Sequence, residues 1–120
     1  MAEDLLMHET MIAQSLFEAI TAEADRHRAR PVSARVSCGQ LNSVNEDVLV
    51  FAFAAVSRGS VCEGLTLEVV QKPLEAHCTD CDRDFRVDLD QPRCSYCGGR
   101  HFTLLPDPPL VLEEIEFETE

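Results

Sequence analysis

The hydrophobic positions of this chain repeat with the period of an α-helix in two separate stretches. Over residues 9–26, apolar side chains recur every three or four positions, which predicts an amphipathic helix. Residues 43–59 show the same period and open with Ser43 and Glu46 at the spacing of a capping box. Gly59 follows a cationic residue and is typical of the position just beyond a helix end. Both stretches are therefore predicted to be helices.

Three other stretches alternate between apolar and polar side chains, which is the period of a half-buried strand. They cover residues 32–38, 65–70 and the tail at 110–120, the last after a stiff Pro-Asp-Pro-Pro connector. Because a helix separates the first two strands, we expect them to be parallel and joined by a right-handed crossover. This order predicts an α+β fold, in which two helices pack on a small mixed three-stranded sheet that the C-terminal strand completes.

Composition and charge narrow the classes of function. The chain has 120 residues, of which 45% are hydrophobic, and a net charge of −12 at pH 7. Such an acidic chain repels phosphate backbones, so nucleic acid is not an expected partner. No apolar run approaches the roughly 20 residues needed to span a bilayer, and the first residues carry no secretory signal. We therefore expect a cytoplasmic protein with no membrane partner.

Four of the six cysteines form two Cys-x2-Cys pairs, Cys78 with Cys81 and Cys94 with Cys97, separated by 12 residues. Each pair can wrap two sulfurs around one ion, and a hairpin between the pairs brings them together. Four thiolates make a closed tetrahedral site with no open position, so we expect a structural zinc ion. Iron in a similar cage, and cysteines that are unligated or disulfide-bonded, are the alternatives.

The cysteine pairs predict a zinc-ribbon module inserted into the α+β fold. We expect a zinc-binding domain at residues 75–105 and a second domain formed by residues 1–74 plus 106–120. Zinc ribbons often bind nucleic acid, but between Cys78 and His101 there are five aspartates and only four arginines. Since no basic, aromatic-interleaved face is present, the module is not expected to bind nucleic acid. No catalytic set of side chains can be argued from the sequence.

The Met-His-Glu stretch at residues 7–9 is the first of several motifs that follow one another in a distinctive order. It is followed by the helical segment IAQSLFEAI, the helical segment SVNEDVLVFAFAAV, the strand segment CEGLTLEVV and the two cysteine pairs, in that order. In this order the chain resembles the HypA/HybF family, the nickel-insertion accessory proteins of nickel–iron hydrogenase maturation. The resemblance extends from residue 7 to about residue 118 and depends on the joint order of weak motifs.

The resemblance implies a nickel metallochaperone and not an enzyme. In the family, the histidine of Met-His-Glu is the nickel ligand, which maps onto His8, with the backbone of Met7 and Glu9 as further candidate ligands. Nitrogen ligands suit the tetragonal geometry that Ni(II) prefers. The nickel would be labile, because a metal that is handed on cannot be held irreversibly. Without the resemblance, the residues favour a solvated histidine just before the helix.

Six residues precede Met7, which is a departure from the family. Family members generally begin at this methionine, so that its free amine can join the nickel site. Either Met7 is the true start of the protein, or the extension is real and the nickel site is altered. In the second case the site is expected to be weaker, because a backbone amide must lose a proton before it ligates.

The resemblance also implies two protein partners: the GTPase of the same maturation pathway and the immature large subunit of hydrogenase. In some bacteria, urease maturation also draws on such a protein. The helix face near residues 8–18 is the expected GTPase contact.

The rival interpretation is a zinc-ribbon interaction adaptor without a transferable metal. A third interpretation, a zinc enzyme, would require an open coordination position at the zinc ion. We expect a monomer or a weak dimer.

Overall fold

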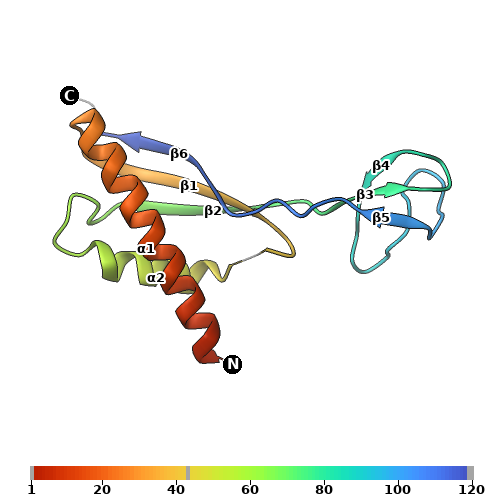
Figure 1. Ribbon diagram of the computed structural model, residues 1–120, viewed down its shortest axis with the longest axis horizontal. Coiled ribbons are helices and arrows are strands. Elements are labelled where there is room, and N and C mark those ends of the chain that lie inside the picture. The colour runs from red at the N-terminus through yellow and green to blue at the C-terminus, as the bar shows by residue number, and fades with distance from the viewer. Residues whose placement is uncertain (1, 43, 119–120) are drawn as a thin grey trace. The chain divides into compact units, whose positions relative to one another are not determined.

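The computed structural model describes the backbone of residues 2–42 and 44–118 and the side chains of residues 8–42 and 44–118. Among these residues, the elements shown in Figure 1 follow in the order α1 Ala2–His27, β1 Pro31–Gly39, α2 Glu46–Ser57, β2 Thr66–Lys72, β3 Glu75–Cys78, β4 Asp84–Arg86, β5 Phe102–Leu104 and β6 Val111–Phe117. The chain divides into two compact units, the first made of Met1–Val36, Val44–Val70 and Val111–Glu120, and the second of Ser37–Ser43 and Gln71–Leu110.

Helix α1 contains the whole of the predicted helix at residues 9–26 and begins earlier. The prediction that His8 stands just before the helix is therefore wrong, because His8 lies within it. Residues 2–7 contain no glycine or proline and include two acidic residues, which are favoured near a helix N-terminus. The apolar repeat starts later than the helix itself, so periodicity alone placed the boundary too late.

Helix α2 begins and ends at residues whose types are common at helix termini, an asparagine before its first turn and a glycine after its last. The side-chain oxygen of Asn45 accepts a hydrogen bond from the backbone N–H of Val48 at 3.0 Å, which makes Asn45 the N-cap. The predicted capping residue, Ser43, lies outside the described residues. At the other end Arg58 is the C-cap, and Gly59 has a φ of +77°. The predicted glycine stop is thus confirmed.

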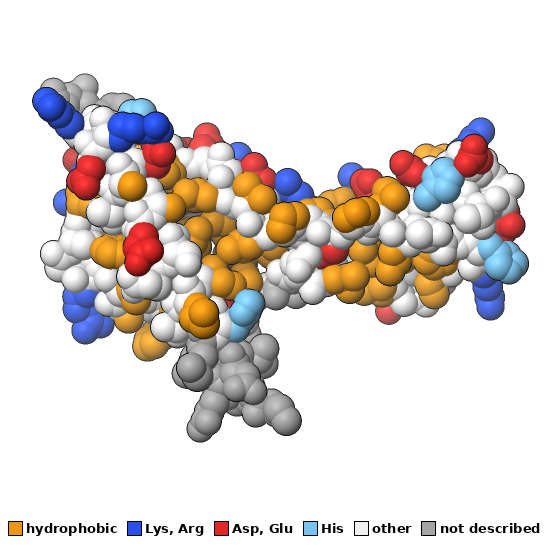
Figure 2. All heavy atoms as spheres, in the orientation of Figure 1, with side chains coloured by type: hydrophobic (Ala, Val, Ile, Leu, Met, Phe, Trp, Pro, Cys, Tyr) orange, Lys and Arg blue, Asp and Glu red, His pale blue; other side chains and the backbone are white. Residues whose placement is uncertain are grey.

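Helix α2 is hydrophobic on nearly all sides, so its sequence alone does not select the buried face. In the structure, Leu49, Ala52 and Phe53 are buried, whereas Phe51 is 74% exposed. Helix α1 packs along α2. Hydrophobic side chains also reach the surface in the part of the molecule that holds these helices (Figure 2). The packing against α1 therefore leaves one hydrophobic face of α2 in contact with solvent.

The first sheet has the strand order β2-β1-β6, so β1 is its central strand. Figure 1 shows β1 and β2 running in the same direction. Strand β6 runs antiparallel to β1, because the backbone N–H of Glu118 donates to the carbonyl of Arg30, while that of Gly39 donates to Pro108, both at 2.8 Å. The predicted mixed three-stranded sheet, completed by the C-terminal strand, is thus confirmed.

The turn after β1 is bound to the connector that leads into β6. The backbone nitrogen and the side-chain Nδ2 of Asn42 both donate to Oδ2 of Asp107, each at 2.7 Å. Oδ1 of the same carboxylate is buried and has no hydrogen-bond partner among the described residues. It lies so close to Gly39 that an added Cβ would collide with it. A glycine is therefore required at position 39 for this approach.

The second sheet has the order β4-β3-β5, with both pairings antiparallel. Phe85 and Phe102 pack edge to face beneath it, with ring centroids 5.5 Å apart. A small core of Leu74, Ala76 and Val87 adjoins these rings. The predicted assignment of residues 75–105 to one domain and of the flanking segments to another stays a prediction. The units of the structure additionally place the turn after β1 with the second sheet.

Candidate metal centres

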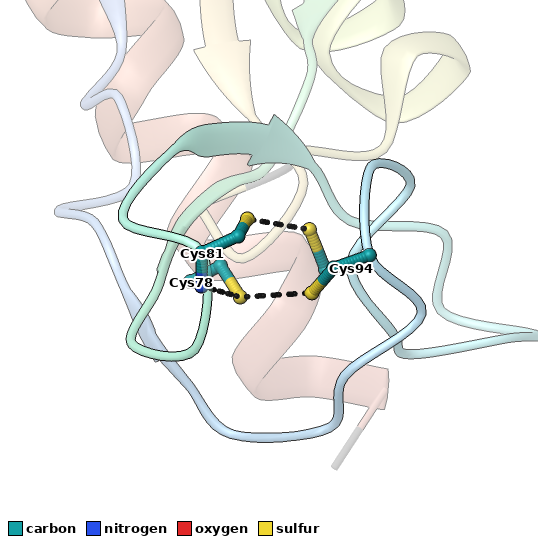
Figure 3. Close-up of side chains that lie close together, drawn as sticks. Cys78, Cys81 and Cys94 are labelled. Carbon is teal, nitrogen blue, oxygen red and sulfur yellow. Dashed lines mark hydrogen bonds between the residues drawn. The ribbon is translucent and has the colours of Figure 1, made fainter.

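The four paired cysteines gather their sulfur atoms into one cluster. The ligand atoms of Cys78, Cys81, Cys94 and Cys97 all lie within 4.8 Å of one another. Figure 3 shows the labelled side chains pointing toward a common centre, and the Sγ atoms of Cys81 and Cys94 are 3.6 Å apart, as are those of Cys78 and Cys97. A zinc ion with four sulfurs at about 2.3 Å requires sulfur–sulfur separations of about 3.8 Å. The donor set therefore fits tetrahedral zinc, and no disulfide joins these residues.

The two cysteine pairs are held by the same backbone arrangement. In the first pair, the N–H of Asp82 donates to the carbonyl of Cys78, and in the second the N–H of Gly98 donates to that of Cys94, both at 2.9 Å. Asp82 and Gly98 both have positive φ, at 62° and 74°. The left-handed residue closes each turn, so the sulfurs of each pair face the same way. Glycine adopts this backbone without steric cost, and aspartate is one of the few other residues that adopt it.

Backbone N–H groups point at three of the sulfurs. The N–H of Cys81 donates to Sγ of Cys78 at 3.5 Å, that of Tyr96 to Sγ of Cys94 at 3.3 Å, and that of Gly99 to Sγ of Cys97 at 3.4 Å. Such donors stabilise thiolates, because they place partial positive charge next to sulfur. They belong to the tight turns that follow Cys78, Cys94 and Cys97, so the local fold is arranged for negatively charged sulfur.

Before a cation binds, the thiols differ in acidity. Burial raises the pKa of Cys81 to about 12, and hydrogen bonds that its thiol donates to the neighbouring cysteine sulfurs add to this effect. Burial also raises the pKa of Cys94, but the backbone N–H groups of Cys97 and Tyr96, together with hydrogen bonds from the thiols of Cys81 and Cys78, outweigh it and lower the pKa to about 7. One thiolate is thus available near neutral pH. A bound zinc ion would deprotonate the others, since coordination favours the thiolate form.

The two histidines beside the cysteine pairs are hydrogen-bonded to aspartate carboxylates. Nδ1 of His77 lies 2.8 Å from Oδ1 of Asp84, and Nε2 lies 2.7 Å from Oδ1 of Asp82. Nδ1 of His101 lies 3.4 Å from Oδ2 of Asp80. The cluster of potential ligand atoms found among the described residues contains the four cysteines and neither histidine. The geometry therefore supports a ligand set made of sulfur alone.

The Met-His-Glu stretch lies in α1 and presents its two polar side chains in opposite ways. His8 is exposed, whereas Glu9 is only 2% exposed. Oε1 of Glu9 accepts a hydrogen bond from the backbone N–H of Asn45 at 3.3 Å. Oε2 is buried and has no partner among the described residues. The side chain of Met7 lies outside the described side chains. The exposed imidazole of His8 thus belongs to a part of α1 whose backbone is anchored by the next residue, Glu9.

The anchoring role of Glu9 and the capping role of Asn45 were missed at the sequence level. A signal for the first was present, because Glu9 continues the buried stripe of α1, whose other members are Ala13, Leu16, Ile20 and Ala24. A carboxylate on an apolar stripe requires a hydrogen-bond donor, but periodicity does not identify the donor. Asn45 lies 36 positions further along the chain, so only the tertiary structure shows this contact.

The sequence has clear relatives among known proteins. Residues 7–117 match the family model described as "Hydrogenase/urease nickel incorporation, metallochaperone, hypA". The hydrogenase maturation factor HybF of Escherichia coli O157:H7 is 33% identical over 113 residues, which covers 93% of this chain and 100% of the relative. The hydrogenase maturation factor HypA of Desulfitobacterium hafniense (strain DSM 10664 / DCB-2) is also 33% identical over 113 residues, covering 93% and 99%.

Two solved structures share the fold. The solution structure of the Ni metallochaperone HypA from Helicobacter pylori superposes with a TM-score of 0.60 and 23% identity, covering 93% of this chain and 98% of that chain. A second structure, described as the solution structure of HypA protein, has a TM-score of 0.68 and 25% identity, covering 95% and 98%. The predicted α+β fold with an inserted cysteine module is therefore confirmed.

Proposed function

Because the chain belongs to the HypA family of hydrogenase maturation metallochaperones, we propose that it carries Ni(II) at a labile site on His8. The nickel would be delivered to the immature large subunit of a nickel–iron hydrogenase, and in some organisms to urease. The observation that carries the proposal is the pairing of an exposed His8 with a buried Glu9 on one helix. The anchored carboxylate fixes the backbone, and the neighbouring imidazole stays accessible to an incoming or leaving ion.

Two metals would then have separate tasks. The four-cysteine cluster would hold zinc permanently, since a closed tetrahedral site has no position for substrate. His8 would hold nickel with the backbone of Met7 and Glu9 as further ligands, and nickel is the cargo of the protein. We assign the nickel site to residues 1–74 plus 106–120 and the zinc site to residues 75–105. The sulfur-only geometry of the cysteine cluster supports this division.

The partners that follow from this role are proteins. They are the GTPase of the maturation pathway, with residues 8–18 of α1 as its contact, and the hydrogenase large subunit. No helix among the described residues is long and apolar enough to cross a membrane. A net charge of −12 disfavours nucleic acid. We place the protein in the cytoplasm and assign it no catalytic step, because delivery needs binding and release only.

Equilibrium dialysis against Ni(II) tests the proposal. We expect His8→Ala to lose one nickel equivalent that the wild-type chain binds, without loss of zinc. His27→Ala is the matched control, since His27 is an exposed histidine at the other end of the same helix. Equal nickel stoichiometry in all three proteins would contradict delivery from His8 and favour the zinc-ribbon adaptor without a transferable metal.

A further inference from the structure

A cavity of about 360 Å³ opens beside the C-terminal end of α1. It lies between the residues that end this helix and the loop that follows α2. All of its lining residues belong to the first unit of the chain, and they are Ala24, Asp25, Arg28, Ala29, Arg30 and Val61. None of them belongs to the sulfur cluster or to the Met-His-Glu stretch. The cavity is therefore a feature that the nickel and zinc sites do not account for.

Helix α1 ends in a Schellman motif at this cavity. The backbone N–H of Ala29 donates to the carbonyl of Ala24 at 3.2 Å, and that of Arg28 donates to the carbonyl of Asp25 at 3.3 Å. Arg28 has the left-handed backbone that the motif requires, with a φ of +50°. The motif brings the two alanines together, and with Val61 they form the apolar part of the cavity lining.

The arginine at this position is unusual. Glycine is the common residue there, because a Cβ makes the left-handed backbone costly. Helix α2 follows that rule, since Gly59 stands after its C-cap with a φ of +77°. Helix α1 carries Arg28 instead. A residue that costs stability where glycine would not indicates that its side chain has a task other than folding.

The cavity is lined by two guanidinium groups, and neither forms an ion pair among the described residues. The side chain of Arg28 also has no hydrogen-bond partner within that part of the chain. Arg30 donates to the backbone carbonyl of Glu63 at 3.0 Å. This bond holds the side chain of Arg30 in place without cancelling its charge. Both positive charges are therefore available to a ligand.

Other carboxylates near the end of α1 are engaged elsewhere. Glu23 pairs with Arg26 and with His27. Oε2 of Glu63 accepts a hydrogen bond from the backbone N–H of Gly59 at 3.1 Å. The whole chain has 22 acidic residues and 10 lysines and arginines, so a shortage of carboxylates is not the reason that the two arginines lack a partner.

The charge of the cavity suits a monoanion. Arg28 and Arg30 supply two positive charges, Asp25 supplies one negative charge, and the C-terminus of α1 supplies about half a negative charge. A single carboxylate balances the remaining surplus to within about half a charge, whereas a phosphate group with a charge of about −2 exceeds it. At physiological ionic strength, charges more than about 8 Å away are largely screened, so the acidity of the whole chain does not prevent this binding.

We propose that this cavity binds an acidic side chain of a partner polypeptide. An aspartate or glutamate carries its carboxylate on a short aliphatic stem, which matches two guanidinium groups beside a small lining of alanine and valine. A guanidinium can hold a carboxylate through two parallel hydrogen bonds, which also fixes its orientation. The C-terminal carboxylate of a polypeptide is the alternative source, but it stands beside the side chain of the last residue and lacks this slender stem. The inference does not depend on nickel binding.

Nuclear magnetic resonance titration of the full zinc-loaded chain with three peptides tests the ligand. Acetyl-Leu-Glu-Leu-amide has only a side-chain carboxylate, acetyl-Leu-Gln-Leu with a free C-terminus has only a terminal one, and acetyl-Leu-Gln-Leu-amide has none. We expect the first peptide to shift the amide signals of residues 24–30 and 58–63, with a dissociation constant about tenfold or more below those of the other two. Equal binding of the neutral peptide, or no binding of any peptide at about 10 mM, overturns the proposal. Binding of the free-terminus peptide that equals or exceeds that of the first overturns the assignment to a side chain.

Two substitutions of Arg28 separate binding from folding. Arg28→Gly and Arg28→Asn both remove the guanidinium and keep a residue that tolerates the left-handed backbone. Each should weaken binding of the first peptide by about tenfold or more. The thermal unfolding midpoint should stay unchanged or rise in Arg28→Gly, because glycine relieves the backbone.

Arg58→Ala is the control for these substitutions. Arg58 is an exposed arginine of the same unit that does not line the cavity, so the variant removes one positive charge and should bind the peptide as the wild-type chain does. Wild-type binding by Arg28→Gly or Arg28→Asn overturns the proposal. An equal loss of binding in Arg58→Ala also overturns it, because the effect would then be one of net charge alone.

Discussion

Oε1 of Glu9 accepts a hydrogen bond from the backbone N–H of Asn45 at 3.3 Å, which joins α1 to the N-terminal cap of α2. The carboxylate is buried, and it adjoins the partial positive charge that the N-terminus of a helix carries. The residue before it is the exposed His8. The contact therefore fixes the backbone of the proposed nickel site without using the imidazole.

Removal of the Glu9 carboxylate should destabilise the protein. Glu9→Ala removes the hydrogen bond to the N–H of Asn45 and leaves a cavity where the buried Glu9 side chain stood, so we expect the free energy of unfolding to fall by about 1–3 kcal/mol. Glu9→Gln keeps an acceptor oxygen and should cost much less. Urea denaturation followed by circular dichroism measures both. Glu18→Ala on the exposed side of the same helix is the control, and an equal loss there would contradict the anchoring role.

The contact between Gly39 and Asp107 predicts non-additive effects on stability. Gly39→Ala places a Cβ against the Asp107 carboxylate and forces it away from Asn42. Asp107→Ala removes the same hydrogen bonds directly. We expect each variant to lower the free energy of unfolding by about 1–2 kcal/mol, and the double variant to cost less than the sum. Additive costs in a double-mutant cycle would show that the two residues act independently.

Zinc should be required for the cysteine unit but not for the helices. Cys78→Ser is expected to lose stoichiometric zinc and the ordered structure of β3, β4 and β5, because metal binding contributes about 10 kcal/mol or more to folding of such sites. The far-UV helical signal should largely remain, since α1 and α2 belong to the other unit.

Elemental analysis and circular dichroism measure the two effects. Cys62→Ser is the matched control, because Cys62 is buried outside the sulfur cluster, where its sulfur lies 3.6 Å from Oγ1 of Thr21. It should keep one zinc ion per chain. Loss of zinc from this variant, or retention of zinc by Cys78→Ser, would contradict the assigned ligand set.

The aspartates around His77 predict a pH dependence. The hydrogen bond to Asp84, and then that to Asp82, raises the pKa of His77 above its ordinary value of 6.5. A raised folded-state pKa contributes stability that is complete below the unfolded value and is lost as the pH rises through the folded value. We therefore expect a loss of stability as the pH rises above about 6.5 and through the raised pKa of His77.

Nuclear magnetic resonance titration of the zinc-loaded protein measures this pKa. Asp84→Asn should lower the titration midpoint of His77, while Asp88→Asn is the control for a general change of charge in the same unit. His77→Gln should remove the stability change over this pH range. An unaltered midpoint in Asp84→Asn would show that the hydrogen bond does not set the protonation of the ring.

Nickel binding through the backbone should unwind the start of α1. In a regular helix, the N–H groups of His8 and Glu9 donate to carbonyls four positions earlier, so they are not free to ligate. A nickel ion that takes deprotonated amide nitrogens must break those bonds. We expect a small loss of far-UV helical signal on nickel binding, and no such loss with His8→Ala. An unchanged helical signal would indicate binding through side chains only.

The sequence predicted well those features that depend on nearby residues. The cysteine cluster follows from two local pairs, and Gly59 marks the end of α2 because one residue needs a left-handed backbone. The start of α1 and the exposure of Phe51 were not predictable from periodicity, since helix-forming residues extend beyond the apolar stripe of α1 and α2 is apolar on nearly all sides. Contacts such as that between Asn42 and Asp107 join residues 65 positions apart, and no local pattern identifies them.

The place of the cysteine unit in the chain gives its metal a thermodynamic effect on the rest of the fold. The chain leaves the first sheet through β2 and returns through β6, with residues 73–110 between them. Within that segment β3 and β5 are neighbours, with Ala76 opposite Leu104. When the cysteine unit is folded, the pairing of β3 with β5 already holds the two ends of this segment together. Only the short connections from β2 to β3 and from β5 to β6 then have to be closed when β6 docks. Loss of zinc would restore the long loop and raise the entropic cost of docking the last strand by roughly 1 kcal/mol, without any change in the contacts of that strand.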